Sequence, residues 1–194
     1  MLIRHPRVVD KILEETRAVF TKADDCRSPS FDVISSSALP YTFAVFNETI
    51  RLYPPVPVEL KECTQDSTFP DGTWLPKAAV VMWAPWSIGR SKRIWGCDAD
   101  LFRPERWLIK NGNGNTCLLS KTAYEFPVFN GGPRSCLGKR MAELLALCVI
   151  VSLTRRYKFI EPVSEHGSRT KERRSQNSLT LPMENGCPCQ IQLR

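Results

Sequence analysis

Histidine is scarce in this sequence, because only His5 and His166 occur among its 194 residues. A zinc site built from cysteine and histidine is therefore poorly supplied, although the chain contains eight cysteines. These cysteines are dispersed, form no CxxC pair and follow no secretory signal, unlike the disulfide framework of a small secreted domain. We expect reduced, mostly unpaired thiols.

Long apolar runs are missing as well. The longest one, LLALCVIVSL at residues 144–153, falls well short of the roughly 20 residues that a helix needs to cross a bilayer. We therefore expect no membrane segment within the chain. A hydrophobic content of 42% instead indicates a globular protein with a core of its own.

Basic residues are in excess, and the net charge of +7 comes partly from RRYK at 155–158 and RTKERRS at 169–175. The aromatic residues are not interleaved with these charges and no nucleic-acid motif occurs, so we expect no nucleic-acid partner. Two interpretations remain open. The basic residues either dock an acidic protein partner or form an ordinary solvated face.

Hydrophobic periodicity predicts three helices. Residues 6–20 carry apolar side chains at helical spacing with Pro6 in the first turn, and residues 40–52 end at the proline pair 54–55. A third, mostly buried helix is predicted from Leu137 to about Tyr157.

The strand predictions are shorter. VPVEL at 56–60 and AAVVMWAP at 78–85 are predicted strands separated by turn residues, NGNGN at 111–115 is a surface loop, and SLTLP at 178–182 pairs with CQIQLR at 189–194 in a closing hairpin. The predicted fold class is mainly α with a small β-sheet (α+β), in a single partial domain over residues 1–194.

One cysteine stands in an unusual setting, the stretch FPVFNGGPRSCLGKRM before the third helix. The unpaired N–H groups and the dipole of that helix would stabilise a thiolate at Cys136, which favours either a nucleophilic or redox thiol or a metal ligand. Neither histidine is near enough in sequence to serve as a base for a nucleophile. Gly132 and Gly138 leave room for a large flat ligand, and Arg134 supplies a cation for its acidic groups.

Five residues of this stretch complete a pattern, F-x-x-G-x-R-x-C-x-G: Phe129, Gly132, Arg134, Cys136 and Gly138. The pattern resembles the haem-binding signature of the cytochrome P450 superfamily. The resemblance implies that Cys136 is the axial thiolate ligand of haem iron and that Arg134 pairs with a haem propionate. It also implies that nearby backbone N–H groups tune the sulfur.

Two further motifs fit the same family. Glu48 and Arg51 stand three residues apart on one face of the second helix, where an apolar setting means that a buried pair needs further partners. FRPERW at 102–107 resembles the family's PERF segment. By this resemblance Glu48, Arg51 and Arg106 form a cluster that fixes the chain positioning the cysteine loop. Trp107 replaces the usual phenylalanine, a change that we expect packing to accommodate.

The resemblance also implies further ligand-facing residues. Lys61 stands where many members carry an arginine that binds a haem propionate, and it keeps the charge but loses the bidentate fork. The substrate-facing residues implied are mainly apolar, which suits a hydrophobic substrate: Pro55, Val56, Pro57, Val58, Glu59 and Leu60 over the haem, and Leu181, Pro182, Met183 and Glu184 in the last loop.

As a member of this family the protein is expected to insert one oxygen atom of O2 into a hydrophobic organic substrate. A flavoprotein reductase that takes electrons from NADPH would supply them to the haem. Lys139, Arg140 and residues 155–158 would attract this acidic reductase by their positive charge. WAPWSIGR and RIWG, within residues 83–96, are similar to the fatty-acid and alkane hydroxylases of eukaryotes.

The resemblance covers essentially all 194 residues, yet it reaches only the C-terminal part of the family's fold. No A/G-G-x-D/E-T-T sequence of the oxygen-activating helix occurs, so no catalytic proton-relay residue is assigned and we expect this portion alone to be inactive. The parent protein would be anchored in the endoplasmic reticulum membrane, whereas this portion lacks the anchor and would be cytoplasmic.

Two alternatives remain beside the monooxygenase. The chain could be an inactive truncated or pseudogene product, or a haem-binding module without catalysis. It could also be a thiol-redox protein that uses Cys136, but the nearest downstream thiol, Cys148, lies about three helical turns away, too far for a disulfide.

Overall fold

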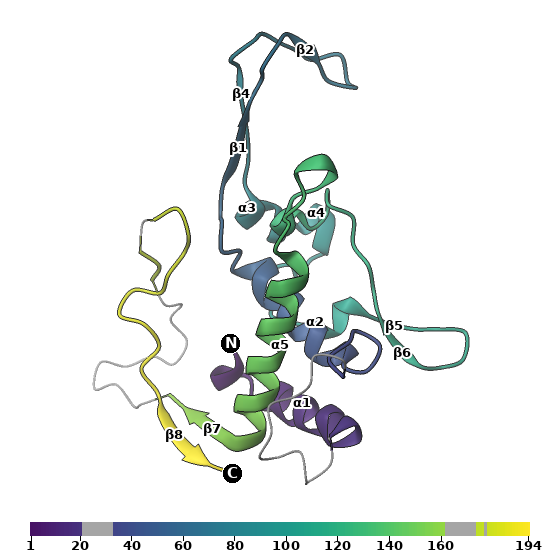
Figure 1. The fold of residues 1–194 in the computed structure, drawn as a ribbon, viewed down its shortest axis with the longest axis vertical. Helices are drawn as coiled ribbons and strands as arrows, with labels where there is room; N and C mark the ends of the chain where they lie inside the picture. Colours follow the sequence, from purple (N-terminus) through teal and green to yellow (C-terminus); the bar gives the residue numbers. More distant parts are fainter. Residues whose placement is uncertain (21–32, 162–173, 177) are drawn as a thin grey trace.

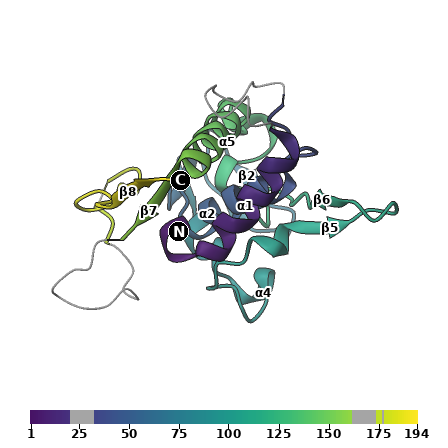
Figure 2. The same ribbon diagram turned by 90° about the horizontal axis from the view of Figure 1, so that it is seen from below.

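Three helices form the centre of the protein, and they lie close to where the sequence predicts them. The computed structural model describes residues 1–20, 33–161, 174–176 and 178–194. The helices α1, α2 and α5 all contact one another (Figures 1 and 2), and they span Pro6–Val19, Pro40–Leu52 and Lys139–Arg156. None of the helices in these described ranges is long and apolar enough to cross a bilayer.

Helix α1 forms because its apolar residues recur on one face and because Pro6 occupies its first turn, where a missing N–H costs nothing. Val8, Ile12 and Thr16, spaced four residues apart, are buried on that face. Val8 and Ile12 pack with Tyr41 and Val45 of α2. The contact between α1 and α2 is therefore encoded in the 3.6-residue period of both helices.

A side chain from α1 caps the start of α2. The residue before α2, Leu39, offers no capping side chain. Glu15 takes this role, because its carboxylate accepts hydrogen bonds from the backbone N–H groups of Tyr41 (2.6 Å) and Thr42 (2.9 Å). Burial raises the pKa of Glu15, although the hydrogen bonds from Thr42 and Tyr41 oppose the rise. This long-range cap fixes the two helices relative to one another.

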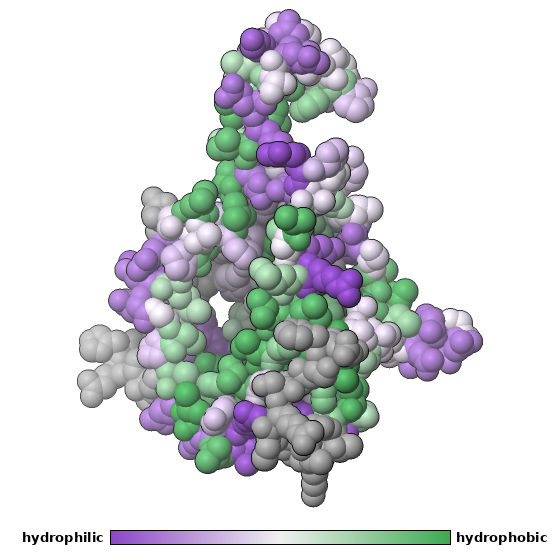
Figure 3. All heavy atoms as spheres, in the orientation of Figure 1, coloured by the Kyte–Doolittle hydropathy of each residue, from purple (hydrophilic) through white to green (hydrophobic). Residues whose placement is uncertain are grey.

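Helix α5 corrects one prediction. The sequence predicts a mostly buried helix, but α1 and α2 cover only one side of it, where Leu147, Val151 and Thr154 are buried. The other side carries exposed apolar residues at steps of four, namely Met141, Leu145, Val149 and Leu153. Apolar side chains accordingly gather over α5 in the centre of the space-filling view (Figure 3).

The strands form four separate two-stranded antiparallel sheets within the described ranges. Three are hairpins or extensions of hairpins, and the last joins the end of α5 to the C-terminus (Figure 1). The pairs are β1 Glu59–Glu62 with β4 Val80–Trp83, β2 Ser67–Thr68 with β3 Trp74–Leu75, β5 Leu108–Lys110 with β6 Thr116–Leu118, and β7 Tyr157–Ile160 with β8 Gln190–Leu193.

The predicted closing hairpin is wrong. Strand β8 pairs with β7, which follows α5 directly, and the backbone N–H of Arg194 extends this ladder by donating to the carbonyl of Arg156 (2.9 Å). The segment 178–182 forms no strand, and its Pro182 has no N–H to donate to a ladder. Met183 instead forms an isolated bridge with Ser175.

Short helical turns lie outside the three long helices and the strands. They are α3 Pro85–Gly89 and α4 Lys92–Trp95, and the 3-10 helices η1 Leu2–Arg4, η3 Pro104–Trp107, η4 Pro127–Phe129 and η5 Gly132–Arg134. A core cluster of Ala44, Trp95, Ala99 and Trp107 joins α2 to α4 and η3. This second core lies beside α2 and carries the segment that precedes the cysteine loop.

Helix α3 packs directly on the backbone of α2 at Gly89. A β-carbon at this position would overlap the carbonyl oxygen of Arg51 and lie 3.2 Å from its carbonyl carbon. We therefore expect Gly89→Ala to destabilise the chain by about 1–3 kcal/mol, because backbone atoms cannot rotate away. Urea unfolding followed by circular dichroism measures the change. The matched control is Gly112→Ala, whose added carbon meets nothing within 4 Å and should leave the midpoint unchanged.

Candidate functional site

The cysteine lies in a turn held by its own backbone. The N–H of Cys136 donates to the carbonyl of Phe129 (2.8 Å), and the N–H of Lys139, the first residue of α5, donates to the carbonyl of Cys136 (3.3 Å). The cysteine therefore stands just before the start of a long helix, as the sequence predicts. Its side chain is exposed.

The glycines of this turn have different reasons to be glycine. Gly132 has a φ of +63°, which favours glycine, and an added β-carbon there would meet nothing within 4 Å. Gly131 packs so closely that a β-carbon would lie 2.7 Å from the methyl group of Ala123. A β-carbon at Gly138 would lie 3.9 Å from the Cys136 sulfur. Open space therefore borders the turn at Gly132 but not at Gly131.

Exposed apolar residues follow the thiol along the chain. Leu137 is fully exposed beside it, and Met141 and Leu145 continue the exposed stripe along α5. Arg134 is exposed within the same turn, and Phe129 is half-buried, with the Lys139 ammonium 5.6 Å from its ring centroid. An exposed thiol, an exposed cation and exposed apolar side chains thus occur within or next to the same turn.

A flat haem-sized cofactor fits this arrangement by its donor chemistry. The exposed sulfur of Cys136 can serve as a thiolate ligand, Arg134 can meet a carboxylate, and the uncovered stripe from Leu137 along α5 offers apolar contact. No group of three or more His, Cys, Asp or Glu that could hold a metal ion occurs within the described ranges. The cysteine turn itself offers one soft ligand, the sulfur of Cys136.

Glu48 is the centre of a buried ionic cluster. Both Glu48 and Arg51 are 0% exposed, and they form a bidentate pair, with Arg51 Nε donating to Oε2 (2.7 Å) and Nη2 to Oε1 (2.8 Å). Oε1 also accepts from the backbone N–H of Arg103 (2.8 Å) and from Arg106 Nε (3.0 Å). The structure thus brings together Glu48, Arg51 and Arg106.

The remaining N–H groups of Arg51 donate to backbone carbonyls. Nη1 donates to the carbonyls of Gly89 and Ala99, and Nη2 also donates to that of Leu101. The guanidinium lies 5.0 Å from the ring centroid of Trp95. Because all five N–H groups of the guanidinium have acceptors, the buried charge is fully solvated by protein.

Arg106 ties the segment after α4 to the same cluster. Its Nη1 donates to the carbonyl of Trp95 (3.1 Å) and its Nη2 to that of Asp98 (2.9 Å). Burial works against ionisation of the Asp98 carboxyl, yet the hydrogen bond and charge of Arg106, with the charge of Arg103, leave its pKa lowered. The chain between α4 and η3 is therefore wrapped around two arginine side chains.

Trp107 is the member that sequence reasoning missed. It is almost completely buried, and its indole Nε1 donates to Glu48 Oε2 at 2.9 Å. From the sequence, this tryptophan is expected to replace a phenylalanine by packing alone, but a phenylalanine side chain has no N–H to donate. One feature of the sequence could have predicted this bond. The indole N–H stands next to Arg106, in a segment that is expected to contact the buried carboxylate of Glu48.

The segment before the cysteine loop has its own lock. Thr122 and Glu125 bond reciprocally, since Thr122 Oγ1 and N donate to the carboxylate while the N–H of Glu125 donates to Thr122 Oγ1. The ammonium of Lys121 donates to Glu125 Oε1 (2.8 Å), and this bond, together with those from Thr122, lowers the pKa of Glu125 to about 2. The carboxylate thus fixes the chain just before Phe126.

The two segments that the resemblance assigns to substrate contact lie side by side. The N–H of Leu181 donates to the carbonyl of Pro55 (3.0 Å), which joins residues 55–60 to the C-terminal loop. Val56, Pro57 and Leu181 are half-buried, while Val58, Leu60, Pro182, Met183 and Glu184 are exposed. Contact with a substrate remains a prediction for all of them.

Strand β1 faces the cysteine loop with one side. Glu59 Oε2 accepts a hydrogen bond from Asn130 Nδ2 (3.1 Å), and Asn130 belongs to the loop. Because side chains alternate along a strand, Lys61 shares this side of β1. The Lys61 ammonium lies 5.4 Å from the ring centroid of Trp83.

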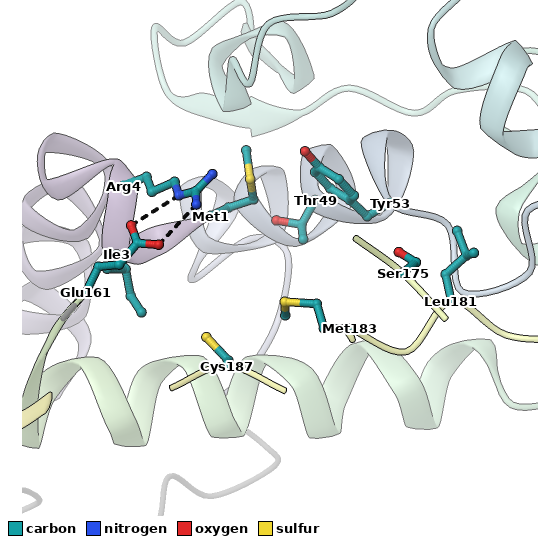
Figure 4. A pocket seen from close by; sticks show the side chains of 10 residues that line it. All are labelled: Met1, Ile3, Arg4, Thr49, Tyr53, Glu161, Ser175, Leu181, Met183 and Cys187. Atoms are coloured by element: carbon teal, nitrogen blue, oxygen red, sulfur yellow. Dashed lines mark hydrogen bonds and ion pairs between the residues drawn. The ribbon is translucent and has the colours of Figure 1, made fainter. Parts of the chain in front are cut away.

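A cavity of about 230 Å³ lies in another part of the protein and does not include Cys136 in its lining. Figure 4 shows it between η1, α2 and the C-terminal segment, with Leu181 and Met183 among its lining residues. The ion pair between Arg4 Nη2 and Glu161 Oε1 (3.0 Å) forms part of its wall. The cavity includes part of the predicted substrate loop but neither Cys136 nor Lys61.

Comparisons with known proteins identify the family of the sequence. A sequence model of the family described as Cytochrome P450 matches residues 1–186. The chain is 37% identical over 193 residues to cytochrome P450 86B1 of Arabidopsis thaliana, which covers 96% of this chain and 33% of that protein. It is 34% identical over 195 residues to cytochrome P450 94A1 of Vicia sativa, covering 100% of this chain and 36% of that protein. The chain therefore spans about a third of the length of these relatives.

Proposed function

The chain belongs to the cytochrome P450 family, and we propose that it is the haem-thiolate portion of a monooxygenase with Cys136 as the ligand of haem iron. The observation that carries this proposal is the exposed thiol of Cys136, held in a glycine-rich turn directly before α5. When bound, haem activates O2 for insertion of one oxygen atom into the substrate, with electrons that a reductase draws from NADPH.

In this proposal the residues of the turn bind and orient the cofactor. Cys136 supplies the thiolate sulfur, and Arg134 pairs with a propionate. Lys61 gives the second cation, as a point charge without a bidentate fork. Phe129 accepts the backbone N–H of Cys136 through its carbonyl and so fixes the direction of the cysteine, while Gly132 and Gly138 keep side chains off the macrocycle.

The proposed substrate is hydrophobic, and a fatty acid is the class we favour. The hydrogen bond between Leu181 and Pro55 supports it by placing two mainly apolar segments together. The likeness of residues 83–96 to fatty-acid hydroxylases supports the same class. The proposed location of the whole protein is the endoplasmic reticulum membrane. This location, like the substrate class, is inferred from the family.

An acidic flavoprotein reductase is the proposed electron donor, and basic residues near the cysteine loop are its proposed docking site. Lys139 and Arg140 begin α5 beside the cysteine loop, whereas residues 155–158 lie at the other end of the helix. An α-helix rises 1.5 Å per residue, so the two groups are separated by roughly 25 Å. We therefore propose Lys139 and Arg140, which are nearest to Cys136 in the chain, as the central residues of the reductase contact.

Residues 1–194 by themselves are not expected to turn over substrate. The thiol of Cys136 is exposed and the apolar stripe on α5 is uncovered, so water reaches the proposed haem face. The test is a chimera in which residues 1–194 replace the matching region of cytochrome P450 94A1 of Vicia sativa. Both proteins are assayed with haem, a medium-chain fatty acid, NADPH and reductase, and products are detected by mass spectrometry.

The chimera should give a hydroxylated fatty acid, and the chain alone should give none. The control is the chimera with Cys136→Ser, which should fold but form no product. A chimera that holds thiolate-ligated haem yet oxidises no fatty acid would contradict the substrate class. Turnover by the 194-residue chain alone would contradict the expectation that it leaves the haem face open to water.

A further inference from the structure

Trp107 connects the buried ionic cluster to the cysteine loop. On one side its indole N–H donates to Glu48 Oε2 (2.9 Å). On the other side its ring meets the ring of Phe126 edge-on, with centroids 4.8 Å apart and planes at 68°. No other side chain in the described ranges is seen to make both contacts.

Phe126 is the first residue of the cysteine segment. It precedes η4, which ends at Phe129, and the carbonyl of Phe129 accepts the N–H of Cys136 (2.8 Å). A short path therefore runs from the Glu48 carboxylate through two aromatic rings to the backbone of the cysteine. Each step is a direct hydrogen bond, ring contact or covalent link.

Further contacts hold Trp107 in place. Its ring packs against Trp95 with centroids 5.3 Å apart, and its backbone carbonyl accepts the N–H of Leu119 (2.7 Å). The side chain is 1% exposed, so rotation away from Glu48 would leave a buried carboxylate oxygen with one donor fewer. The direction of the N–H and the plane of the ring that contacts Phe126 are consequently fixed together.

We propose that Trp107 is a positioning residue for Cys136: its indole N–H, bound to Glu48, fixes the plane of the ring that contacts Phe126 and thereby the cysteine loop. A phenylalanine at this position could fill the space but could not be oriented by Glu48. The effect on the loop should therefore follow the loss of the N–H rather than the loss of ring volume.

The test compares two replacements of tryptophan by phenylalanine in the 194-residue chain. Trp107→Phe removes the N–H bound to Glu48, and Trp95→Phe removes the N–H that donates to the carbonyl of Ile88 (3.1 Å) in the same aromatic cluster. Amide hydrogen exchange of Cys136 is the readout. Trp107→Phe should speed the exchange of the Cys136 amide about tenfold or more, while the exchange of amides in α1 should change much less. Trp95→Phe should not speed exchange at Cys136 more than exchange in α1.

A second variant keeps the test decisive if Trp107→Phe does not fold. Phe126→Leu cuts the ring contact and leaves the bond between Trp107 and Glu48 intact. It should also speed exchange at Cys136, and the two changes together should be far from additive. Exchange at Cys136 that is unchanged by Phe126→Leu, or raised by Trp107→Phe only as much as in α1, would overturn the assignment. These readouts need no haem, so their failure is distinguishable from failure of the proposed function.

Discussion

Replacing Glu48 with glutamine is expected to destabilise the chain by about 3–5 kcal/mol, the effect of removing one partner from a buried ion pair. Glutamine has nearly the same volume, so the loss would come from charge and acceptors alone. Its amide group would turn a donor toward Arg51, Arg106 or the indole of Trp107, which are donors themselves. Because domains are stable by only about 5–15 kcal/mol, much of the chain should unfold at moderate urea.

The control for this variant is an ion pair at the surface. Lys11 Nζ lies 2.6 Å from Glu105 Oε1, but the two side chains are 51% and 45% exposed. Lys11→Ala should therefore change the free energy of unfolding by no more than about 1 kcal/mol. Equal losses for the two variants in urea unfolding would contradict a structural role for the Glu48 cluster.

Replacing Cys136 with serine is expected to abolish thiolate-type binding of haem. A hydroxyl group stays protonated where a thiol can ionise, so the proposed iron ligand is lost while the turn keeps its backbone bonds. The loss of affinity should exceed tenfold, since even residues that only support a ligand contribute about 10–100-fold. Haem titration of the purified chain measures the change. Cys97→Ser, at another exposed thiol, is the matched control and should bind as the unaltered chain does.

The helices and the ionic cluster could be anticipated because their signals are local. Pro6 and Pro40 mark the starts of α1 and α2, and the apolar period fixes their buried faces. Glu48 and Arg51 are three residues apart, so one helical turn brings them together whatever the rest of the chain does. The family likeness then adds Arg106, which no local rule could place beside them.

The features that could not be predicted depend on contacts between distant parts of the chain. Strand β8 pairs with β7 and not with the nearer segment 178–182. The path of the chain after α5 determines this pairing. The cap that Glu15 provides for α2 requires the packing of α1 on α2. The strands β5 and β6 have three residues each, too few for an alternating pattern to be recognised.

Two further differences concern the site itself. The apolar sequence of α5 predicts burial, yet its exposed stripe lies beside the thiol, where hydrophobicity suits contact with a ligand or another protein surface as well as a core. Trp107 is read from the sequence as a ring of a certain size, whereas its role depends on where one N–H points. Residue type alone does not give that direction.

The most direct test of the central claim is the difference spectrum of the reduced, haem-loaded chain with carbon monoxide, recorded for the unaltered protein, for Cys136→Ser and for Cys97→Ser. We predict the red-shifted Soret band of a thiolate-ligated haem in the unaltered chain and in Cys97→Ser, and its absence in Cys136→Ser. The same band in all three proteins, or in none of them, would contradict the assignment of Cys136 as the haem ligand.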